Sequence, residues 1–268
     1  MSMRSYDGTQ RRHYDSVARE QGSNSVSTMP DRIVRETESR SIVSAVSSWL
    51  ERADGTEASI KIADLGCGNG TTLSVLRDSF PSSQVFGVEY NEELLRIAQK
   101  VPGVKVVWGD LVESATLPDE EYDVVVLQRV LINIQDESDQ VSALKNVVSL
   151  IKPGGLLIAI EAFETGLQFM NEARHEFNLP AVKMPHHNLF LPEDFFQGMD
   201  LLERVDLGIP EYFLSTHYYL SYVLYPALAT ATGGEFNRNS TFVRLLSQML
   251  PNVGDFGSNR FCTFTRSC

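Results

Sequence analysis

Ile62-Ala63-Asp64-Leu65-Gly66-Cys67-Gly68-Asn69-Gly70 is the stretch that decides how this chain folds. An apolar strand, predicted over 59–65, ends beside a carboxylate and breaks into three glycines at every second position. A helical pattern follows over 71–80. Glycine allows positive φ and close approach to a ligand, and the N–H groups at a helix N-terminus attract anionic groups. Strand, glycine loop and helix together predict a nucleotide- or nucleoside-binding corner.

The spacing of the glycines separates one kind of corner from another. The dinucleotide fingerprint G-x-G-x-x-G needs a glycine where this chain has Thr71, and a P-loop needs a lysine that the loop lacks. The pattern D-x-G-x-G-x-G instead resembles the first motif of class I S-adenosylmethionine (SAM)-dependent methyltransferases. The resemblance implies SAM as cofactor, held by Asp64, Gly66, Cys67, Gly68 and Gly70.

Net charge and the length of the apolar runs limit the kinds of partner that this chain can bind. The 268 residues include 35 acidic and 23 basic side chains, a formal net charge of −12, which argues against a nucleic-acid partner because a phosphate backbone needs a basic surface. The longest apolar run, around 156–160, is far shorter than the roughly 20 residues of a membrane span. The first residues lack a signal-peptide core. We therefore expect a cytoplasmic protein with no membrane partner. The sequence is also compatible with a homodimer.

Alternating strand and helix patterns indicate a parallel sheet covered by helices. We predict an α/β fold with a Rossmann-like, seven-stranded class I methyltransferase sheet over 56–268 and an N-terminal helical lid over 1–55. Insertions after strands five and six, at about 162–199 and 210–255, are expected to shape the acceptor pocket. The first insertion reads as irregular. Strands are predicted at 59–65, 84–89, 105–108, 122–127, 156–161, 201–207 and 261–265, the last at an edge, with a turn at 152–155.

Three strand ends supply further candidates for the cofactor site. Glu89 ends strand two, where a carboxylate can accept both hydroxyls of a ribose, as it also does in dehydrogenases. Gly109 and Asp110 end strand three. In the family that this chain resembles, an acid there accepts a hydrogen bond from the adenine amino group and the next N–H, here of Leu111, meets a ring nitrogen. Tyr90 is expected on the adenine face.

The amino-acid end of the cofactor is expected near the end of strand four. The resemblance places the backbone carbonyl of Gln128 there. The segments 27–36 and 129–133 also resemble a bacterial branch of small-molecule methyltransferases. That likeness implies that Met29 and Arg35 cover the cofactor, with Arg35 near its carboxylate. Tyr14 is a further candidate for the same covering role.

The catalytic residues that the protein needs depend on which atom receives the methyl group. Transfer from a sulfonium needs mainly a well-placed nucleophile, and a hydroxyl nucleophile must also lose its proton. Glu161 ends strand five, where ligands of open α/β sheets bind. His186 and His187, in the first insertion, are alternative bases. We expect no metal site, because adjacent histidines diverge in an extended chain and no acid has matching spacing.

Two absences narrow the reaction. After strand four the chain reads Leu127-Gln128-Arg129-Val130 instead of the Asn/Asp-Pro-Pro-Tyr of enzymes that methylate amides and exocyclic amines. The same loop also lacks the Pro-Cys nucleophile of cytosine C5 methylation. We therefore expect methylation of a small molecule, at oxygen rather than nitrogen or carbon, in secondary-metabolite or saccharide biosynthesis. Two alternatives stay open, an NAD(P)-dependent oxidoreductase and a non-catalytic SAM-binding partner protein.

Overall fold

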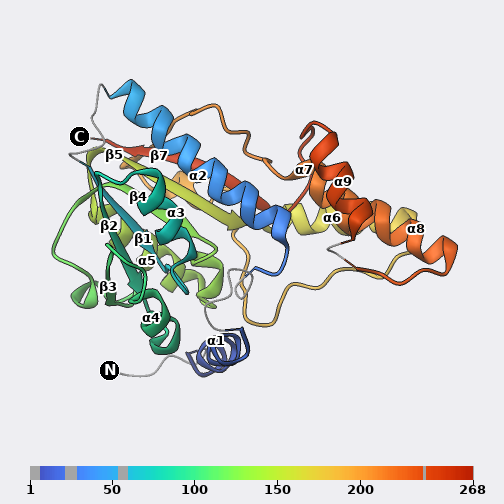
Figure 1. Ribbon diagram of the computed structural model, residues 1–268, viewed down its shortest axis with the longest axis horizontal. Helices are drawn as coiled ribbons and strands as arrows, with labels where there is room; N and C mark the ends of the chain where they lie inside the picture. Colours follow the sequence, from blue (N-terminus) through green and yellow to red (C-terminus); the bar gives the residue numbers. More distant parts are fainter. Residues whose placement is uncertain (1–6, 22–28, 54–59, 238–239, 268) are drawn as a thin grey trace.

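A single mixed sheet forms the centre of the molecule in a computed structural model that describes residues 7–21, 29–53, 60–237 and 240–267 (Figure 1). Within these residues seven strands run in the order β3-β2-β1-β4-β5-β7-β6. The first five are parallel, and β7 is antiparallel to both of its neighbours. The strands are β1 (Lys61–Leu65), β2 (Gln84–Glu89), β3 (Lys105–Trp108), β4 (Tyr122–Gln128), β5 (Ile151–Ala162), β6 (Leu202–Arg204) and β7 (Asn259–Arg266). The predicted α/β, Rossmann-like fold is confirmed.

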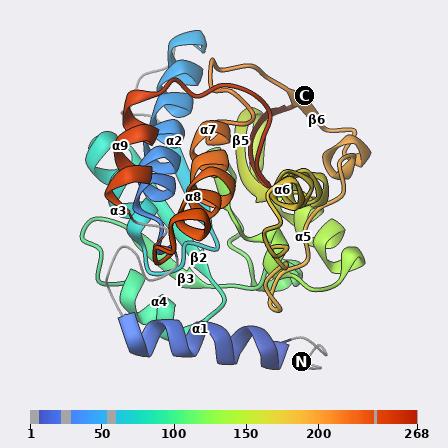
Figure 2. The same ribbon diagram turned by 90° about the vertical axis from the view of Figure 1, so that its right-hand side faces the viewer.

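Helices cover both faces of the sheet (Figure 2). The helices of the described residues are α1 (Asp7–Gln21), α2 (Arg32–Arg52), α3 (Thr71–Ser79), α4 (Glu92–Ala98), α5 (Glu137–Ser149), α6 (Glu164–Glu176), α7 (Ser215–Tyr219), α8 (Tyr225–Thr232) and α9 (Thr241–Met249). Side-chain caps fix several helix starts, as Asn91 does by accepting hydrogen bonds from the N–H groups of Glu93 and Leu94. The predicted boundary between residues 55 and 56 lies outside the described residues.

Two apolar cores lie on opposite sides of the sheet. Because successive side chains of a strand point to opposite faces, Val124 packs with α2, α3 and α7, while Val125 packs with α5. Both valines are fully buried. Burial on both faces explains why the central strands read as continuous apolar runs rather than alternating ones.

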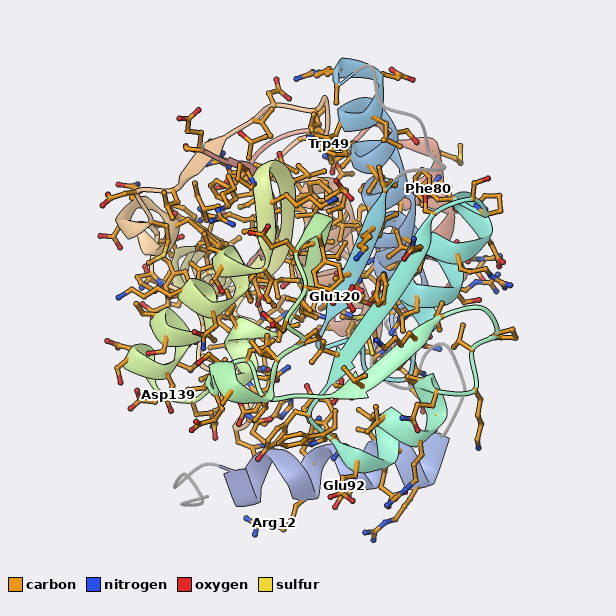
Figure 3. All side chains as sticks on the ribbon, turned by 90° about the vertical axis from the view of Figure 1, so that its left-hand side faces the viewer. Arg12, Trp49, Phe80, Glu92, Glu120 and Asp139 are labelled. Carbon is orange, nitrogen blue, oxygen red and sulfur yellow. The ribbon has the colours of Figure 1, made fainter. Side chains whose placement is uncertain are left out.

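Helix α1 lies apart from these layers, across one end of the sheet. It packs beside α4, where Asn91 donates a hydrogen bond to Asp15 at 2.8 Å. Figure 3 shows Arg12 on the outer side of α1, pointing away from the sheet. The opposite side of the helix therefore faces the ends of β1 to β4. No helix among the described residues is both long and apolar enough to cross a membrane.

The order of the last strands differs from the prediction. The strand predicted at an edge is β7, which lies between β5 and β6, and the short β6 takes the edge. The predicted turn at 152–155 falls inside β5. Ile151 pairs with Tyr122 and the next pair is Leu156 with Val124, so four residues bulge out of the ladder. Gly154 allows the bulge with a φ of 76°.

The segment predicted as irregular after β5 contains α6, and the later insertion contains a helix with a π-helical stretch at Leu220–Leu224. Pro226 explains the irregularity, because proline has no N–H to donate to the carbonyl of Tyr222. Arg174 of α6 donates to that carbonyl instead. The two insertions are thus joined by a hydrogen bond that satisfies a broken helix turn.

A buried histidine joins the start of α2 to the second insertion. His217 Nε2 lies 3.0 Å from Asp31 Oδ2, and His217 Nδ1 lies 2.8 Å from Ser247 Oγ on α9. Asp31 also caps α2 through the N–H groups of Ile33 and Val34. Burial raises the pKa of Asp31, but the hydrogen bonds outweigh it and leave the pKa below its usual value.

Candidate functional site

The glycine loop between β1 and α3 adopts a conformation that other residues rarely take. Gly66, Gly68 and Gly70 have φ values of 80°, 57° and 83°. A Cβ on Gly66 would lie 2.6 Å from Val130 Cγ2, and one on Gly70 would lie 2.8 Å from Val101 Cγ2. The predicted need for glycine thus has two causes, positive φ and close packing against neighbouring segments.

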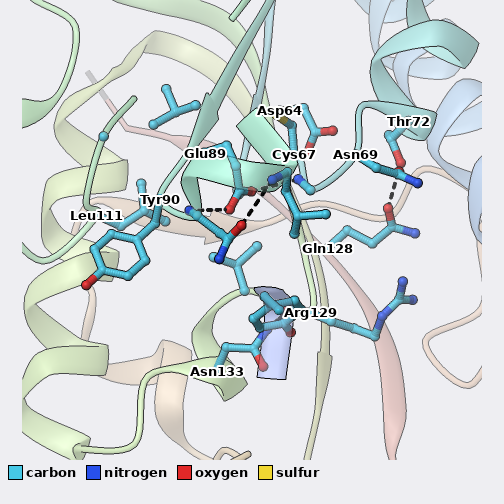
Figure 4. Close-up of a pocket in the computed structure, with 18 of the residues that line it drawn as sticks. Asp64, Cys67, Asn69, Thr72, Glu89, Tyr90, Leu111, Gln128, Arg129 and Asn133 are labelled. Atoms are coloured by element: carbon cyan, nitrogen blue, oxygen red, sulfur yellow. Dashed lines mark hydrogen bonds between the residues drawn. The ribbon is translucent and has the colours of Figure 1, made fainter. Parts of the chain in front are cut away.

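A pocket opens at the carboxyl ends of β1 to β4, where ligands of open α/β sheets bind (Figure 4). The glycine loop, the ends of β2 and β3, and parts of α1 and α2 line it. Eleven predicted cofactor residues lie in its wall. They are Arg35, Asp64, Gly66, Cys67, Gly68, Glu89, Tyr90, Gly109, Asp110, Leu111 and Gln128. Gly70 and Met29 lie outside the lining, and Met29 packs against the apolar core beneath α2.

Glu89 holds the glycine loop against the end of β2. One carboxylate oxygen accepts from the N–H of Gly68 at 2.8 Å, and the other accepts from the N–H of Asn91 at 2.7 Å. Burial raises the pKa of Glu89 although these hydrogen bonds act against the rise. A carboxylate has about four acceptor positions, so the backbone N–H groups leave capacity for a ligand hydroxyl group.

Asp64 has an unsatisfied acceptor in the pocket wall. The side chain is 1% exposed, and its Oδ2 has no hydrogen-bond partner in the described part of the chain. Burial, together with the nearby Glu89, raises the pKa of Asp64 to about 7. Buried polar atoms in proteins are almost always paired. This oxygen is therefore suited to a ligand that brings a donor, such as an ammonium group.

Arg35 places a cation in the same wall. It is buried on α2, and burial followed by repulsion from Arg129 lowers its pKa to about 10. The guanidinium therefore stays charged at neutral pH. An arginine beside a cavity matches the planar geometry of a carboxylate.

Sequence reasoning missed an ion pair between Glu38 and Arg129, of which Arg129 lines the pocket. Glu38 of α2 is fully buried and accepts hydrogen bonds from Arg129 and, at 2.7 Å, from the side chain of Gln128. The Gln128 side chain in turn accepts from Thr72 at 2.7 Å. Arg129 has a φ of 56°, unusual for a residue other than glycine. Glu38 lies four residues from both Val34 and Ile42, which are buried on the apolar face of α2. This spacing is the sequence signal that would have revealed a buried glutamate.

Asp110 has the position expected of an adenine-binding acid. It is buried at the end of β3, and its Oδ1 accepts from the N–H of Val112 at 3.0 Å. Its own N–H donates to Thr116 at 2.9 Å, which fixes the turn. Trp108 donates to the carbonyl of Tyr90 at 2.9 Å and thereby links the ends of β2 and β3. The two strand ends form one side of the pocket.

Glu161 lies outside the pocket lining, and backbone N–H groups surround its carboxylate. It is fully buried, and its two oxygens accept from the N–H groups of three consecutive residues after β4, at 2.9, 3.0 and 3.2 Å. Burial raises its pKa to about 7 against the effect of these bonds. Because the carboxylate is occupied in fixing 130–132, its geometry argues against the predicted role as a base.

His186 and His187 lie outside the pocket lining and beside α1. The rings of His187 and His13 are stacked, with centroids 3.7 Å apart, and His186 completes the group at 6.1 Å from His13. Burial, then His13 and His186, lowers the pKa of His187 to about 4. Tyr14, which lines the pocket, has its ring 6.3 Å from that of His187. Sequence reasoning missed His13 because 173 positions separate it from His186.

Comparisons with known proteins agree with this geometry. Residues 62–155 match the family described as a methyltransferase domain. The demethylmenaquinone methyltransferase of Staphylococcus aureus (strain JH9) is 28% identical over 118 residues, which are 42% of this chain and 47% of that protein. The chain thus matches about half the length of the curated relative.

Solved structures share the fold. The SAM-bound magnesium protoporphyrin IX methyltransferase from Synechocystis PCC 6803 aligns with a TM-score of 0.55 and 16% identity over all of both chains. The N-methyltransferase NodS from Bradyrhizobium japonicum WM9, bound to S-adenosyl-L-homocysteine (SAH), aligns at 0.51 and 15% identity, covering 72% of this chain and 88% of that one. Residues 62–155 therefore carry a methyltransferase domain, and the chain has the class I fold of the SAM- and SAH-bound methyltransferases with which it aligns. The resemblance carried by the glycine loop is confirmed, and the oxidoreductase alternative is set aside.

Proposed function

We propose that this protein transfers the methyl group of SAM to a small-molecule acceptor, with oxygen as the favoured acceptor atom. One observation carries the proposal. The acids of three strand ends, Asp64, Glu89 and Asp110, and the buried Arg35 line the same pocket around the glycine loop. These four side chains complement an adenosine that carries an amino-acid tail.

The proposed roles follow the chemistry of each group. Asp110 accepts from the adenine amino group, and the N–H of Leu111 faces the ring. Glu89 accepts from the ribose hydroxyls with the acceptor positions that the loop leaves open. Asp64 pairs with the ammonium group, and Arg35 pairs with the carboxylate. When bound, SAM supplies an already activated methyl group, so the protein mainly orients the acceptor.

The acceptor is proposed to approach between α1 and the segment after β4. Tyr14 and Asn133 line this side of the pocket, and their side chains are hydrogen-bonded. Burial raises the pKa of Tyr14 above its usual value, although this hydrogen bond acts to lower it. The absence of an Asn/Asp-Pro-Pro-Tyr sequence after β4 favours oxygen over nitrogen. Secondary-metabolite or saccharide biosynthesis supplies acceptors of this kind.

A methyl-transfer assay tests the proposal. The purified protein is incubated with SAM and a panel of hydroxylated small molecules, with amines of matched size alongside, and products are read by mass. We expect a gain of one methyl group on hydroxylated compounds together with formation of SAH. SAM binding without turnover across the panel would favour the non-catalytic alternative, and methylation confined to the amines would contradict the assignment to oxygen.

A further inference from the structure

Three histidines from distant parts of the sequence meet beside the pocket. His13 comes from α1, and His186 and His187 come from the loop that follows α6. One ring nitrogen of each lies within 4.8 Å of the others. The cluster joins a helix that covers the cofactor pocket to the loop that follows α6.

The backbone around the cluster is held in place. Gln10, which lines the pocket, donates to the carbonyl of His187, and Gln135 donates to that of His186 at 2.6 Å. Asn188 donates to the side chain of Asn133 at 2.9 Å, which again lines the pocket. The loop thus has a defined place from which its two imidazoles reach α1.

One atom of the cluster has no protein partner. His187 Nδ1 is buried and makes no hydrogen bond within the described residues. Buried polar atoms of native proteins nearly always have a partner, and an exception calls for a ligand or another explanation. An imidazole with a buried, unpaired ring nitrogen, next to two further imidazoles, is suited to a metal ion.

We propose that His13, His186 and His187 bind one divalent transition-metal ion of the Zn²⁺ class, with the His13 ring turned out of its stack on His187 so that a nitrogen of each ring points at the ion. Imidazole nitrogen suits zinc, copper, iron and nickel, whereas magnesium and calcium prefer oxygen ligands. Three protein ligands leave a fourth position of a tetrahedral ion open to water or another small ligand. No residue near His186 and His187 in the sequence supplies a third ligand, and His13 of α1 supplies it in the fold.

A bound ion would also affect cofactor binding, and this part of the inference rests on the proposed function. His13 lies on α1 between Gln10 and Tyr14, and both of these line the cofactor pocket. A metal bond from His13 to the loop fixes α1 over that pocket. The ion and the cofactor therefore stabilise the same position of α1 and bind with positive coupling, which is equal in both directions.

Metal binding is tested first, without reference to activity. The full chain, freed of metal by a chelator, is titrated with Zn²⁺ in a calorimeter and with Co²⁺ in a spectrophotometer. We expect one ion per chain and at least tenfold weaker binding in the double variant His13→Ala/His187→Ala. The matched control is His175→Ala, which removes an exposed histidine of α6 outside the cluster. Absence of binding, or equal affinity in wild type and the double variant, would overturn the site.

Coupling is tested by SAH affinity with and without Zn²⁺. We expect tighter SAH binding with the ion present, no such effect in the double variant, and the same factor for Zn²⁺ affinity with and without SAH. Unchanged SAH affinity despite bound Zn²⁺ would overturn the fixing of α1. Failure of SAH to bind at all would contradict the proposed function and leave the metal titration as an independent result.

Discussion

At the scale of the residue, Asp64 combines burial with an unpaired oxygen. Its pKa is raised to about 7, so in the free protein near neutral pH the carboxyl is partly protonated. A cofactor ammonium group pairs only with the ionised form. SAM or SAH affinity should therefore rise as pH increases toward 7 and level off above it, with a proton released on binding below that point.

The pH dependence separates Asp64 from its neighbours. Calorimetry with SAH from pH 5.5 to 8.5 measures it, and Asp64→Asn should flatten the curve and weaken binding at the upper end of the range. Wild-type affinity that does not change across this range, or a curve that Asp64→Asn leaves unchanged, would speak against the ammonium contact.

Glu89 and Asp110 should each contribute directly to cofactor affinity. Replacing either with alanine removes hydrogen bonds to the ligand, and we expect a loss of about 1–3 kcal/mol, or roughly 5- to 150-fold in dissociation constant. Glu89→Ala also frees the N–H of Gly68, so its effect should be the larger of the two. Glu92→Ala is the control, because Glu92 is exposed on α4 and outside the pocket. Unaltered SAH binding by both variants would refute these contacts.

Much of the pocket wall was predictable because its residues follow local patterns. Glu89 and Asp110 come directly after buried strands, and the carboxyl ends of parallel strands meet at one edge of a sheet. The role of Glu161 was not predictable, because position at a strand end does not say whether backbone N–H groups occupy the carboxylate. The partnership of Glu38 and Arg129 depends on a helix docking onto β4, which no local pattern specifies.

At the scale of the element, the Glu38–Arg129 pair fixes α2 to the end of β4. Glu38→Ala leaves a buried, strained arginine without its counter-charge, and we expect the free energy of unfolding to fall by about 3–5 kcal/mol. Urea denaturation measures the change. Glu36→Ala on the same helix removes an exposed partner of Arg32 and should cost at most about 1 kcal/mol. Equal losses in the two variants would mean that the buried pair does not anchor α2.

The elements themselves were predicted unevenly, for physical reasons. Parallel strands carry periodic patterns, and β1 to β4 lie close to their predicted ranges. Strand order is set by non-local pairing, so the sequence placed β7 at an edge that β6 occupies. Helix α6 escaped prediction because its polar, half-exposed sequence lacks a broad apolar stripe.

At the scale of the whole molecule, His217 ties the second insertion to the start of α2. His217→Ala removes the contacts to Asp31 and Ser247 and leaves Asp31 Oδ2 without this partner, so we expect a loss of about 1–3 kcal/mol in the free energy of unfolding. His175→Ala, at an exposed position, should have little effect.

Lowering the pH should reduce the difference in the free energy of unfolding between wild type and His217→Ala. The pKa of Asp31 in the folded protein lies below its usual value of 3.8, so its stabilising contribution is present above that pH and is lost as pH falls below it. Urea denaturation at several pH values measures the effect. A difference between wild type and His217→Ala that persists undiminished below the pKa of Asp31 would contradict the assigned contact.

The wall of acids and Arg35 at the ends of β1 to β3 is the feature on which the account depends, and a crystal structure with SAH bound tests it most directly. We predict the adenine amino group at Asp110, the ribose hydroxyls at Glu89, and the ammonium and carboxylate groups at Asp64 and Arg35. Density for SAH at any other place on the molecule, or in this pocket with its amino-acid end away from Arg35, would contradict the account.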